Sequence, residues 1–334
     1  MNRGYADVQV RGKRVAVPCL RWGAHTVVVH GRWLRIASIH DEVLAEGDVV
    51  SDPAQLISHM ATNGLRADIL TFSQKIYQQE PNHRHPFEWD NAAVADTTNF
   101  EKWWEALPQE SRKNVRRAAR RDVSVRVATF DDAFASGVKA IYDETPIRQG
   151  RRFWHYGKAL ETVKRENSTY SDRSEFLGAY CGDELIGFMK FVYVDRVAVM
   201  MQILSKAAHY DRRPMNALVA KAVEVCANKG IRYLMYSKFT FGNKRDSQIA
   251  EFKRRNGFVQ IDYPRYYVPL TLRGKLAVRL RLYRGLLGLL PPSIISLLSR
   301  VRSSVLGALT QAPRANGSSD ASRLPLSSSS GESR

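Results

Sequence analysis

The sequence predicts an α/β fold, a mixed β-sheet with flanking helices, and two observations carry this prediction. Three strand-like segments, residues 175–181, 185–194 and 197–204, follow one another with only short turns between them, as in an antiparallel meander. A long helix with apolar residues at helical spacing comes next; it begins at Pro214 and stops at Gly230.

The segment after this helix indicates a mixed sheet and argues against a β-sandwich. Residues 232–237 again have strand character. A helix that joins two hydrophobic strands implies a right-handed crossover and a parallel pair. A further helix around residues 251–255 and a final strand up to residue 268 complete the order.

The N-terminal part looks like a degenerate copy of this unit. Residues 14–18, 25–30 and 33–39 have strand character, and a helix begins at Pro53 after a capping Asp52. In both copies a proline-started helix stops at a glycine, and the next strand ends in an aromatic residue followed by serine. These pairs are Phe72-Ser73 and Tyr236-Ser237.

We therefore expect a tandem with four segments. Residues 1–95 form a degenerate N-terminal half-domain, and residues 96–270 form the complete domain. Basic amphipathic helices are expected over 271–312 and a disordered, Ser-rich tail over 313–334. Between the halves, residues 80–91 have the composition of a polar, proline-punctuated linker.

The net charge of +18 is concentrated in three places. They are the segment from Arg112 to Arg121, the group Arg148, Arg151 and Arg152, and the C-terminal region, which has no Asp or Glu between Asp262 and Asp320. Solvated faces usually alternate in sign, and these do not. The pattern predicts polyanionic partners: nucleotide phosphates, RNA or an anionic membrane surface.

Cysteine and histidine usage predicts neither disulfides nor a metal site. Cys19, Cys181 and Cys226 form no Cys-x-x-Cys pair, which suits a reducing compartment. The amino terminus has no apolar run, so a cytoplasmic protein is expected. His83 and His85 lie two apart in a loop without matching ligands, so no metal is expected there.

Two local patterns resemble a known family. The run Arg112-Lys-Asn-Val-Arg-Arg-Ala-Ala-Arg-Arg-Asp-Val123 is similar to R-x-x-I-R-K-A-x-x-x-G-V, and Phe252-Lys253 with Asn256-Gly-Phe258 is similar to F-K-x-x-x-G-F. Both are patterns of the Fem-like branch of the Gcn5-related N-acetyltransferase (GNAT) fold, and the resemblance spans residues 95–270. It implies an acyltransferase, with acyl-coenzyme A or aminoacyl-tRNA as the donor and no permanently bound cofactor.

The resemblance also implies where the reaction would occur. Lys253 matches the family lysine beside the donor, whose charge can stabilise the reacting carbonyl, and Phe252 precedes it. Tyr236 ends the strand next to the thioester and can protonate a leaving thiolate. Glu144, His155 and His209 are further candidates for a general base. With no nucleophile system in the sequence, direct attack by the acceptor amine is expected.

Donor phosphates are expected at basic helix ends. The stretch Arg212-Arg-Pro-Met-Asn-Ala217 matches the family's phosphate loop, Arg/Gln-x-x-Gly-x-Gly/Ala, except that Met215 replaces the glycine. Arg212 and Arg213 remain suited to phosphate. The candidate binding residues also include Arg112, Arg116, Arg148, Arg151 and Arg152.

Two questions stay open at this stage. The acceptor can be an amine on a sugar, a lipid-linked molecule or a peptide, and the aminoacyl-tRNA alternative points to cell-envelope precursors. A second class of function is a non-catalytic protein that binds RNA or a membrane. The short basic amphipathic helices after residue 271 favour the inner face of an anionic membrane, where they would lie in the interface.

Overall fold

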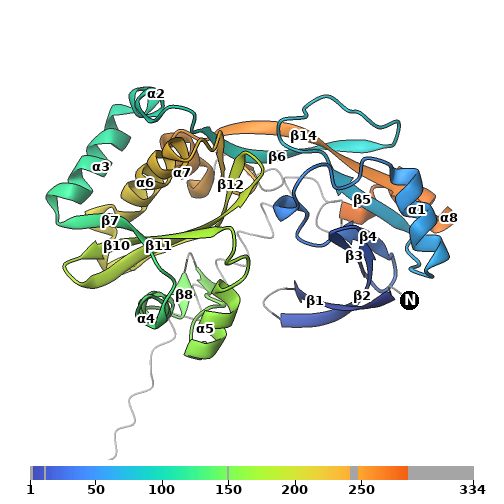
Figure 1. Ribbon diagram of the computed structural model, residues 1–334, viewed down its shortest axis with the longest axis horizontal. Coiled ribbons are helices and arrows are strands. Elements are labelled where there is room, and N and C mark those ends of the chain that lie inside the picture. The colour runs from blue at the N-terminus through green and yellow to red at the C-terminus, as the bar shows by residue number, and fades with distance from the viewer. Residues whose placement is uncertain (1–2, 11–12, 149, 241–246, 285–334) are drawn as a thin grey trace, which may run out of the picture. The chain divides into compact units, whose positions relative to one another are not determined.

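The computed structural model describes residues 3–284 except 11–12, 149 and 241–246 (Figure 1). The chain divides into two units, residues 1–289 and 290–334, and all described residues belong to the first. The predicted tail, and the predicted helical segment beyond residue 284, lie outside the described residues.

Twelve strands of the described chain form one mixed sheet, in the order β1-β2-β3-β4-β5-β14-β6-β13-β12-β11-β10-β7. The strands of the N-terminal part are β1 (Arg3–Val10), β2 (Lys13–Trp22), β3 (His25–His30), β4 (Ile36–Ile39), β5 (Ile69–Ser73) and β6 (Phe87–Asp96). Those of the C-terminal part are β7 (Val123–Ala128), β10 (Ser174–Cys181), β11 (Glu184–Val194), β12 (Val197–Ser205), β13 (Tyr233–Met235) and β14 (Val259–Pro269). The α/β mixed-sheet prediction is confirmed.

Helices cover both faces of the C-terminal part of this sheet (Figure 1). One face carries α2 (Phe100–Ala106), α3 (Gln109–Arg120), α6 (Pro214–Asn228) and α7 (Gln248–Arg255). The other carries α4 (Asp132–Tyr142) and α5 (Leu160–Asn167), with the small ribbon β8 (Ile147–Arg148) and β9 (Arg151–Arg152) between them in the chain. The remaining elements are η1 (Glu42–Leu44), α1 (Pro53–Thr62), η2 (Ala207–Arg212), α8 (Leu272–Arg279) and η3 (Leu282–Arg284).

The same strand–helix–strand unit occurs in both parts. The helix α1 joins β4 to β5, α6 joins β12 to β13, and each joined pair is parallel. The proline start of each helix is as expected: the Asp52 carboxylate accepts from the N–H groups of Ala54 and Gln55, and Pro214 is the first residue of α6. The repeat inferred from the aromatic–serine pattern is thus present in the topology. The sequence did not predict β1.

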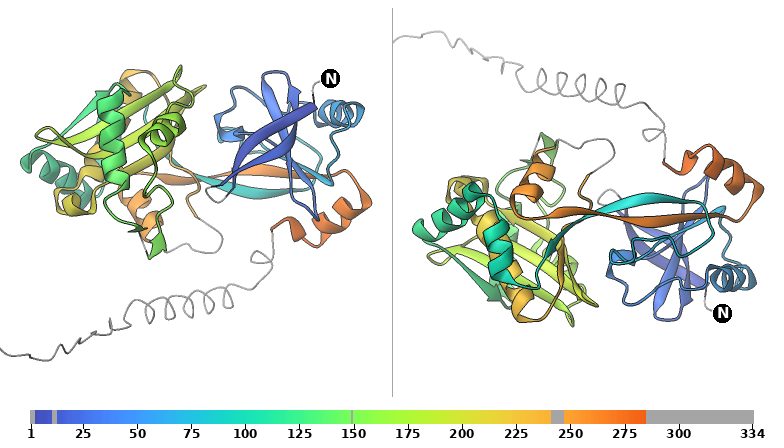
Figure 2. Two further views of the ribbon diagram at one scale, coloured as in Figure 1. Left: turned by 90° about the horizontal axis from the view of Figure 1, so that it is seen from below. Right: turned by 90° about the horizontal axis from the view of Figure 1, so that it is seen from above.

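The last strand of each part crosses to the other part. The strand β6 pairs antiparallel with β13, and β14 pairs antiparallel with β5. The two also pair with each other over eight residue pairs, from Val259–Val94 to Tyr266–Phe87. Figure 2 shows them running together as a long ribbon that both parts share. Since each part completes its sheet with the other's strand, the two form one continuous sheet.

A network of ion pairs stabilises this shared ribbon. The Arg265 guanidinium binds the Asp90 and Glu42 carboxylates, each at 3.0 Å, and Glu42 accepts from the Ser73 N–H at 2.7 Å. The Lys238 ammonium binds Asp90 at 2.7 Å. Burial alone would raise the pKa of Asp90, yet the hydrogen bonds and charges of Lys238 and Arg265 hold it below the usual value.

The predicted linker over 80–91 is wrong in its second half, because β6 begins at Phe87. Its polar residues resemble a loop in sequence, but Asp90 is buried by the ion pairs and the Asn91 side chain bonds to the backbone N–H and carbonyl of Thr240. The partners Lys238 and Thr240 lie about 150 residues from Asp90 and Asn91 in the chain. Nothing local in the sequence reveals them.

Replacing Arg265 by methionine should destabilise the protein strongly. The change keeps an unbranched apolar stem but leaves the half-buried Glu42 and buried Asp90 without their shared partner, which costs about 3 kcal/mol. Urea unfolding at neutral pH measures this. Arg165→Met, at an exposed position of α5, is the control and should change stability little. A loss below about 1 kcal/mol for Arg265→Met would mean that solvent screens the network.

Candidate active site

A fork between two parallel strands marks the candidate site. The strands β12 and β13 pair only from Val197–Tyr233 to Val199–Met235. Beyond this point β12 continues to Ser205, while the segment after β13 turns toward β6. There the Tyr236 N–H donates to the Ala93 carbonyl and the Ala93 N–H donates to the Ser237 carbonyl, both at 2.8 Å. Ser237 takes a left-handed conformation at φ 49°. The two strands therefore separate beyond Val199 and Met235.

The predicted pair Lys253 and Tyr236 lies at this fork. The Lys253 ammonium donates to the Lys238 carbonyl at 2.5 Å and lies 4.5 Å from the centre of the Tyr236 ring. Lys253 is only 1% exposed, so it is not a surface lysine, and burial lowers its pKa to about 8. Burial likewise raises the pKa of Tyr236. At neutral pH the lysine is mostly charged and the tyrosine keeps its proton.

The geometry explains each residue of the Phe-Lys-x-x-x-Gly-Phe pattern. Lys253 turns inward to the strand end, while Phe252 lines a groove on the outer side. Gly257 has φ 77°, and a Cβ there would lie 2.5 Å from the Trp103 indole nitrogen, so only glycine fits. Phe258 is buried in the core under α6. Gly257 and Phe258 therefore serve packing, and Phe252 also packs against this core from its partly buried position.

The groove beside Phe252 has a volume of about 510 Å³ and lies between α3, the start of α6 and α7. The side chains of Asn216 and Asn256 join α6 to α7 by a hydrogen bond of 2.9 Å. Within the described chain, the exposed Arg213 guanidinium makes no hydrogen bond or ion pair, whereas Arg254 and Arg255 are both paired with Glu251. The lining residues are Ser111, Asn114, Arg213, Asn216, Ser247, Gln248, Glu251, Phe252, Arg254, Arg255 and Asn256.

The start of α6 offers few backbone donors for a phosphate. Pro214 has no N–H, and the N–H groups of Asn216 and Ala217 both donate to the Arg213 carbonyl. Among the described residues this leaves only the N–H of Met215, which stands where the family loop has glycine. A phosphate in this groove would thus depend on the Arg213 side chain more than on the backbone.

The other predicted arginines are not in the groove. Arg212 donates to the Arg121 carbonyl at 2.6 Å, which docks η2 on the end of α3. Arg148 donates to the carbonyls of Ser205 and Ile141 and to Glu144, so its guanidinium is used inside the protein.

Four more of the predicted arginines do not line this groove. Arg151 and Arg152 are exposed on β9. Arg112 and Arg116 lie on α3, where Arg116 is stacked 5.6 Å from the Trp104 ring centre. The structure therefore brings together Lys253 with Tyr236, and Arg213 with Phe252.

The remaining general-base candidates have other partners. The Glu144 carboxylate accepts from the N–H groups of Ala207 and Ala208. His155 is buried against Gln202, and burial, followed by the charges of Lys158 and Arg148, lowers its pKa to about 3. His209 pairs with Glu184 at 3.4 Å. Only Tyr236 of the four candidates lies beside Lys253.

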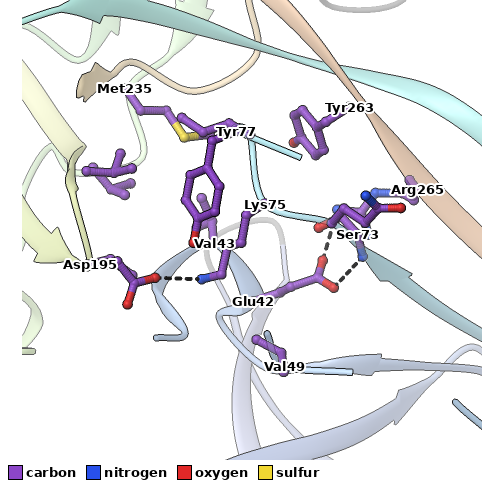
Figure 3. A pocket seen from close by; sticks show the side chains of 15 residues that line it. Glu42, Val43, Val49, Ser73, Lys75, Tyr77, Asp195, Met235, Tyr263 and Arg265 are labelled. Atoms are coloured by element: carbon purple, nitrogen blue, oxygen red, sulfur yellow. Dashed lines mark hydrogen bonds and ion pairs between the residues drawn. The ribbon is translucent and has the colours of Figure 1, made fainter. Parts of the chain in front are cut away.

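A cavity of about 70 Å³, which the sequence did not predict, lies over the base of the fork, where Val199 and Met235 line it (Figure 3). Its polar side holds Lys75, 3.5 Å from Asp195, and Tyr77 lies beside them. Burial lowers the pKa of Lys75, against the raising effect of Asp195. The space is enough for a few water molecules or the end of a chain-like ligand. Lys75 and Asp195 are 120 residues apart and belong to no local motif.

The described residues contain no group of three or more His, Cys, Asp or Glu side chains placed to hold a metal ion. His83 instead packs edge-on against the rings of Phe72 and Tyr266. In the described part of the chain no helix is both long and apolar enough to span a bilayer. The three cysteines are free thiols, and Cys226 is buried.

Comparison with solved structures identifies the fold. FemX superposes with a TM-score of 0.53 at 9% identity, over 82% of this chain and 89% of its own. The C-terminal domain of a protein assigned as a lysylphosphatidylglycerol synthetase from Agrobacterium fabrum superposes with a TM-score of 0.51 at 13% identity. The match covers 83% of this chain and 87% of that domain. The chain has the Fem-like GNAT fold.

A third similar structure belongs to a conserved protein of unknown function from Bacteroides thetaiotaomicron, with a TM-score of 0.50 at 9% identity, over 76% of this chain and 86% of that one. No protein-family model matches the sequence, and no curated protein sequence is significantly similar to it. The expected Fem-like fold is thus confirmed by structure, at identities too low to transfer a substrate.

The buried Lys253 should make the free energy of unfolding depend on pH in the alkaline range. Its pKa is about 8 in the folded protein and near 10.5 when unfolded, so between these values the unfolded state binds more protons and the free energy of unfolding rises with pH. Lys253→Met should remove a rise on the order of 2–3 kcal/mol between pH 8 and 10.5. Urea titrations at several pH values test this, with exposed Lys102→Met as the control. The same slope in both variants would contradict the burial of a charged lysine.

Proposed function

We propose that the protein is an N-acyltransferase that moves an acyl or aminoacyl group to the amine of a sugar, a lipid-linked molecule or a peptide. The observation that carries the proposal is Lys253, held with its ammonium at the fork between β12 and β13 while its neighbour Phe252 lines the groove of Arg213. The fold shared with FemX supports an acyl-transfer reaction over other chemistry.

The reaction needs no protein nucleophile. The acceptor amine attacks the acyl carbonyl, a C–N bond forms, and negative charge develops on the carbonyl oxygen, where the Lys253 ammonium can stabilise it. The C–S or C–O bond to the donor then breaks. Tyr236, which keeps its proton because burial raises its pKa, gives that proton to the leaving group. The proton lost by the amine passes to solvent, and solvent returns a proton to the Tyr236 oxygen.

Both candidate donors carry phosphates that Arg213 can bind. Acyl-coenzyme A is the donor that the fold suggests first. One observation favours aminoacyl-tRNA: Pro214 removes a backbone donor, and Met215 replaces the glycine on which a diphosphate cradle depends. A tRNA backbone spreads its charge and can also use the exposed arginines of α3, such as Arg116.

The acceptor would approach from the other face of the sheet. The cavity that holds Lys75 and Asp195 reaches Val199 and Met235, the last paired residues before the fork. A site with an apolar wall and a charged rim suits an amphipathic acceptor. Donor and acceptor would then meet at the fork from opposite sides.

The alternative is a non-catalytic protein that binds RNA or a membrane through its basic faces. A charged lysine buried at the fork is costly, and a protein that only binds through its surface has no use for it. We place the enzyme in the cytoplasm, because its three thiols are free and one is buried.

Removing the Lys253 charge should slow turnover and leave donor binding intact. Lys253→Met should lower kcat by about 100-fold with an unchanged donor Kd, because the charge acts on the carbonyl oxygen only as the bond forms. Lys221→Met, on the exposed side of α6 where it pairs with Glu224, is the control. Acyl transfer to an amine panel, with melting temperatures for both variants, measures this. Unchanged kcat in a folded Lys253→Met variant would remove the lysine from the mechanism.

Arg213→Gln should weaken donor binding, with little change in kcat at saturating donor. We expect a loss of about 10-fold in affinity, the value of one charge-assisted contact to phosphate. Arg165→Gln on α5 serves as the matched control. The salt dependence of wild-type binding separates the donors, since a tRNA releases many counterions and coenzyme A few. Equal donor affinity in wild type and Arg213→Gln would show that phosphates bind elsewhere.

A further inference from the structure

Three leucines, two in α8 and one at its C-cap, form an exposed stripe. Leu272, Leu276 and Leu280 are 83%, 56% and 51% exposed. They are spaced four residues apart, so they follow one side of the helix within an arc of about 80°. A row of large apolar side chains in water is costly unless another surface covers it.

The opposite side of α8 is fixed to the domain, which holds the leucines outward. Gly274 and Ala277 are buried there, and a Cβ on Gly274 would come within 1.9 Å of the Asp68 carbonyl. Thr271 caps the helix and donates to the Asp68 carboxylate at 2.9 Å. Tyr283, just beyond the helix, stacks on Tyr267 of β14 with ring centres 4.0 Å apart. The orientation of the stripe is therefore set by packing.

Cations flank the leucines on both sides. On a helical wheel Arg273 follows the stripe on one edge, and Lys275 and Arg279 precede it on the other. All three are exposed. The sequence has no Asp or Glu between Asp262 and Asp320. The Asp68 carboxylate at the start of the helix interacts electrostatically with Arg273.

Not all nearby cations are available. Arg284 donates to Glu88 at 3.0 and 3.1 Å, and Arg281 lies 4.0 Å from the same carboxylate. An exposed tryptophan, Trp33, lies close to the stripe, since its carbonyl accepts from Arg273 at 3.1 Å.

We propose that the leucine stripe of α8, with Arg273, Lys275 and Arg279, docks on an anionic bilayer surface. The leucines would enter the acyl boundary while the cations meet lipid phosphates, and Trp33 suits the headgroup level. Positive charge on both edges argues for a negatively charged planar partner over a second copy of this chain, whose own stripe would bring like charges together. The proposal does not depend on the transferase activity.

Vesicle co-sedimentation of the full chain tests the proposal. Wild type should bind phosphatidylcholine vesicles that contain about one-third phosphatidylglycerol and should not bind pure phosphatidylcholine. Replacing Leu272, Leu276 and Leu280 by glutamine should reduce binding at least about 10-fold. Replacing Arg273, Lys275 and Arg279 by glutamine should do the same at physiological salt. A matched control replaces three exposed arginines elsewhere, Arg21, Arg84 and Arg165, and should bind like wild type.

Other occupants of the stripe give different results, and each would overturn the proposal. If a downstream segment of the chain covers the leucines, the triple glutamine variant should melt at a lower temperature. If a second copy covers them, the variant should change from dimer to monomer in light scattering. Wild-type binding by the leucine variant, or equal binding to neutral vesicles, would also exclude a bilayer. The proposal predicts an unchanged melting temperature and unchanged oligomeric state.

Discussion

The antiparallel pairing of β6 with β14 is the constraint on which the rest of the structure depends. Each strand ends one part of the chain and completes the sheet of the other, so neither part has a finished sheet alone. The Arg265 guanidinium between Asp90 and Glu42 fixes this ribbon electrostatically. Buried charges are stable only when they stay close to their partners. The ion pairs therefore hold β6 and β14 in one register, and this register fixes how the two parts of the sheet join within the described unit.

Hydrogen bonds from this ribbon position the residues of the candidate active site. The strand β6 holds Tyr236 and Ser237 through Ala93 and fixes Thr240 through Asn91. Lys253 then binds the Lys238 carbonyl in the same segment, while the Lys238 side chain returns to Asp90. The last strand of the degenerate N-terminal part thus supports the catalytic lysine proposed for the other part.

Local signals in the sequence predicted most of the elements and part of the site. Pro214 and Gly230 delimit α6, and the Phe-Lys-x-x-x-Gly-Phe pattern led to Lys253, because these depend on neighbouring residues. The polar start of β6 was mistaken for a linker, since its partners are distant in sequence. For the same reason the cavity of Lys75 and Asp195 was missed. Arg148 and Arg212 looked free in sequence because carbonyl acceptors carry no residue signature.

In the proposed enzyme, donor phosphates lie at Arg213 while the reacting carbonyl lies at Lys253. Two crystal structures test this arrangement. One contains a non-hydrolysable acyl-coenzyme A analogue, and the other contains an RNA minihelix with a stable aminoacyl group on its terminal adenosine. For one of the two ligands we expect phosphate density within hydrogen-bond distance of Arg213 and the acyl carbonyl at the Lys253 ammonium. Donor density elsewhere, with the groove beside Phe252 empty in both complexes, would contradict this arrangement.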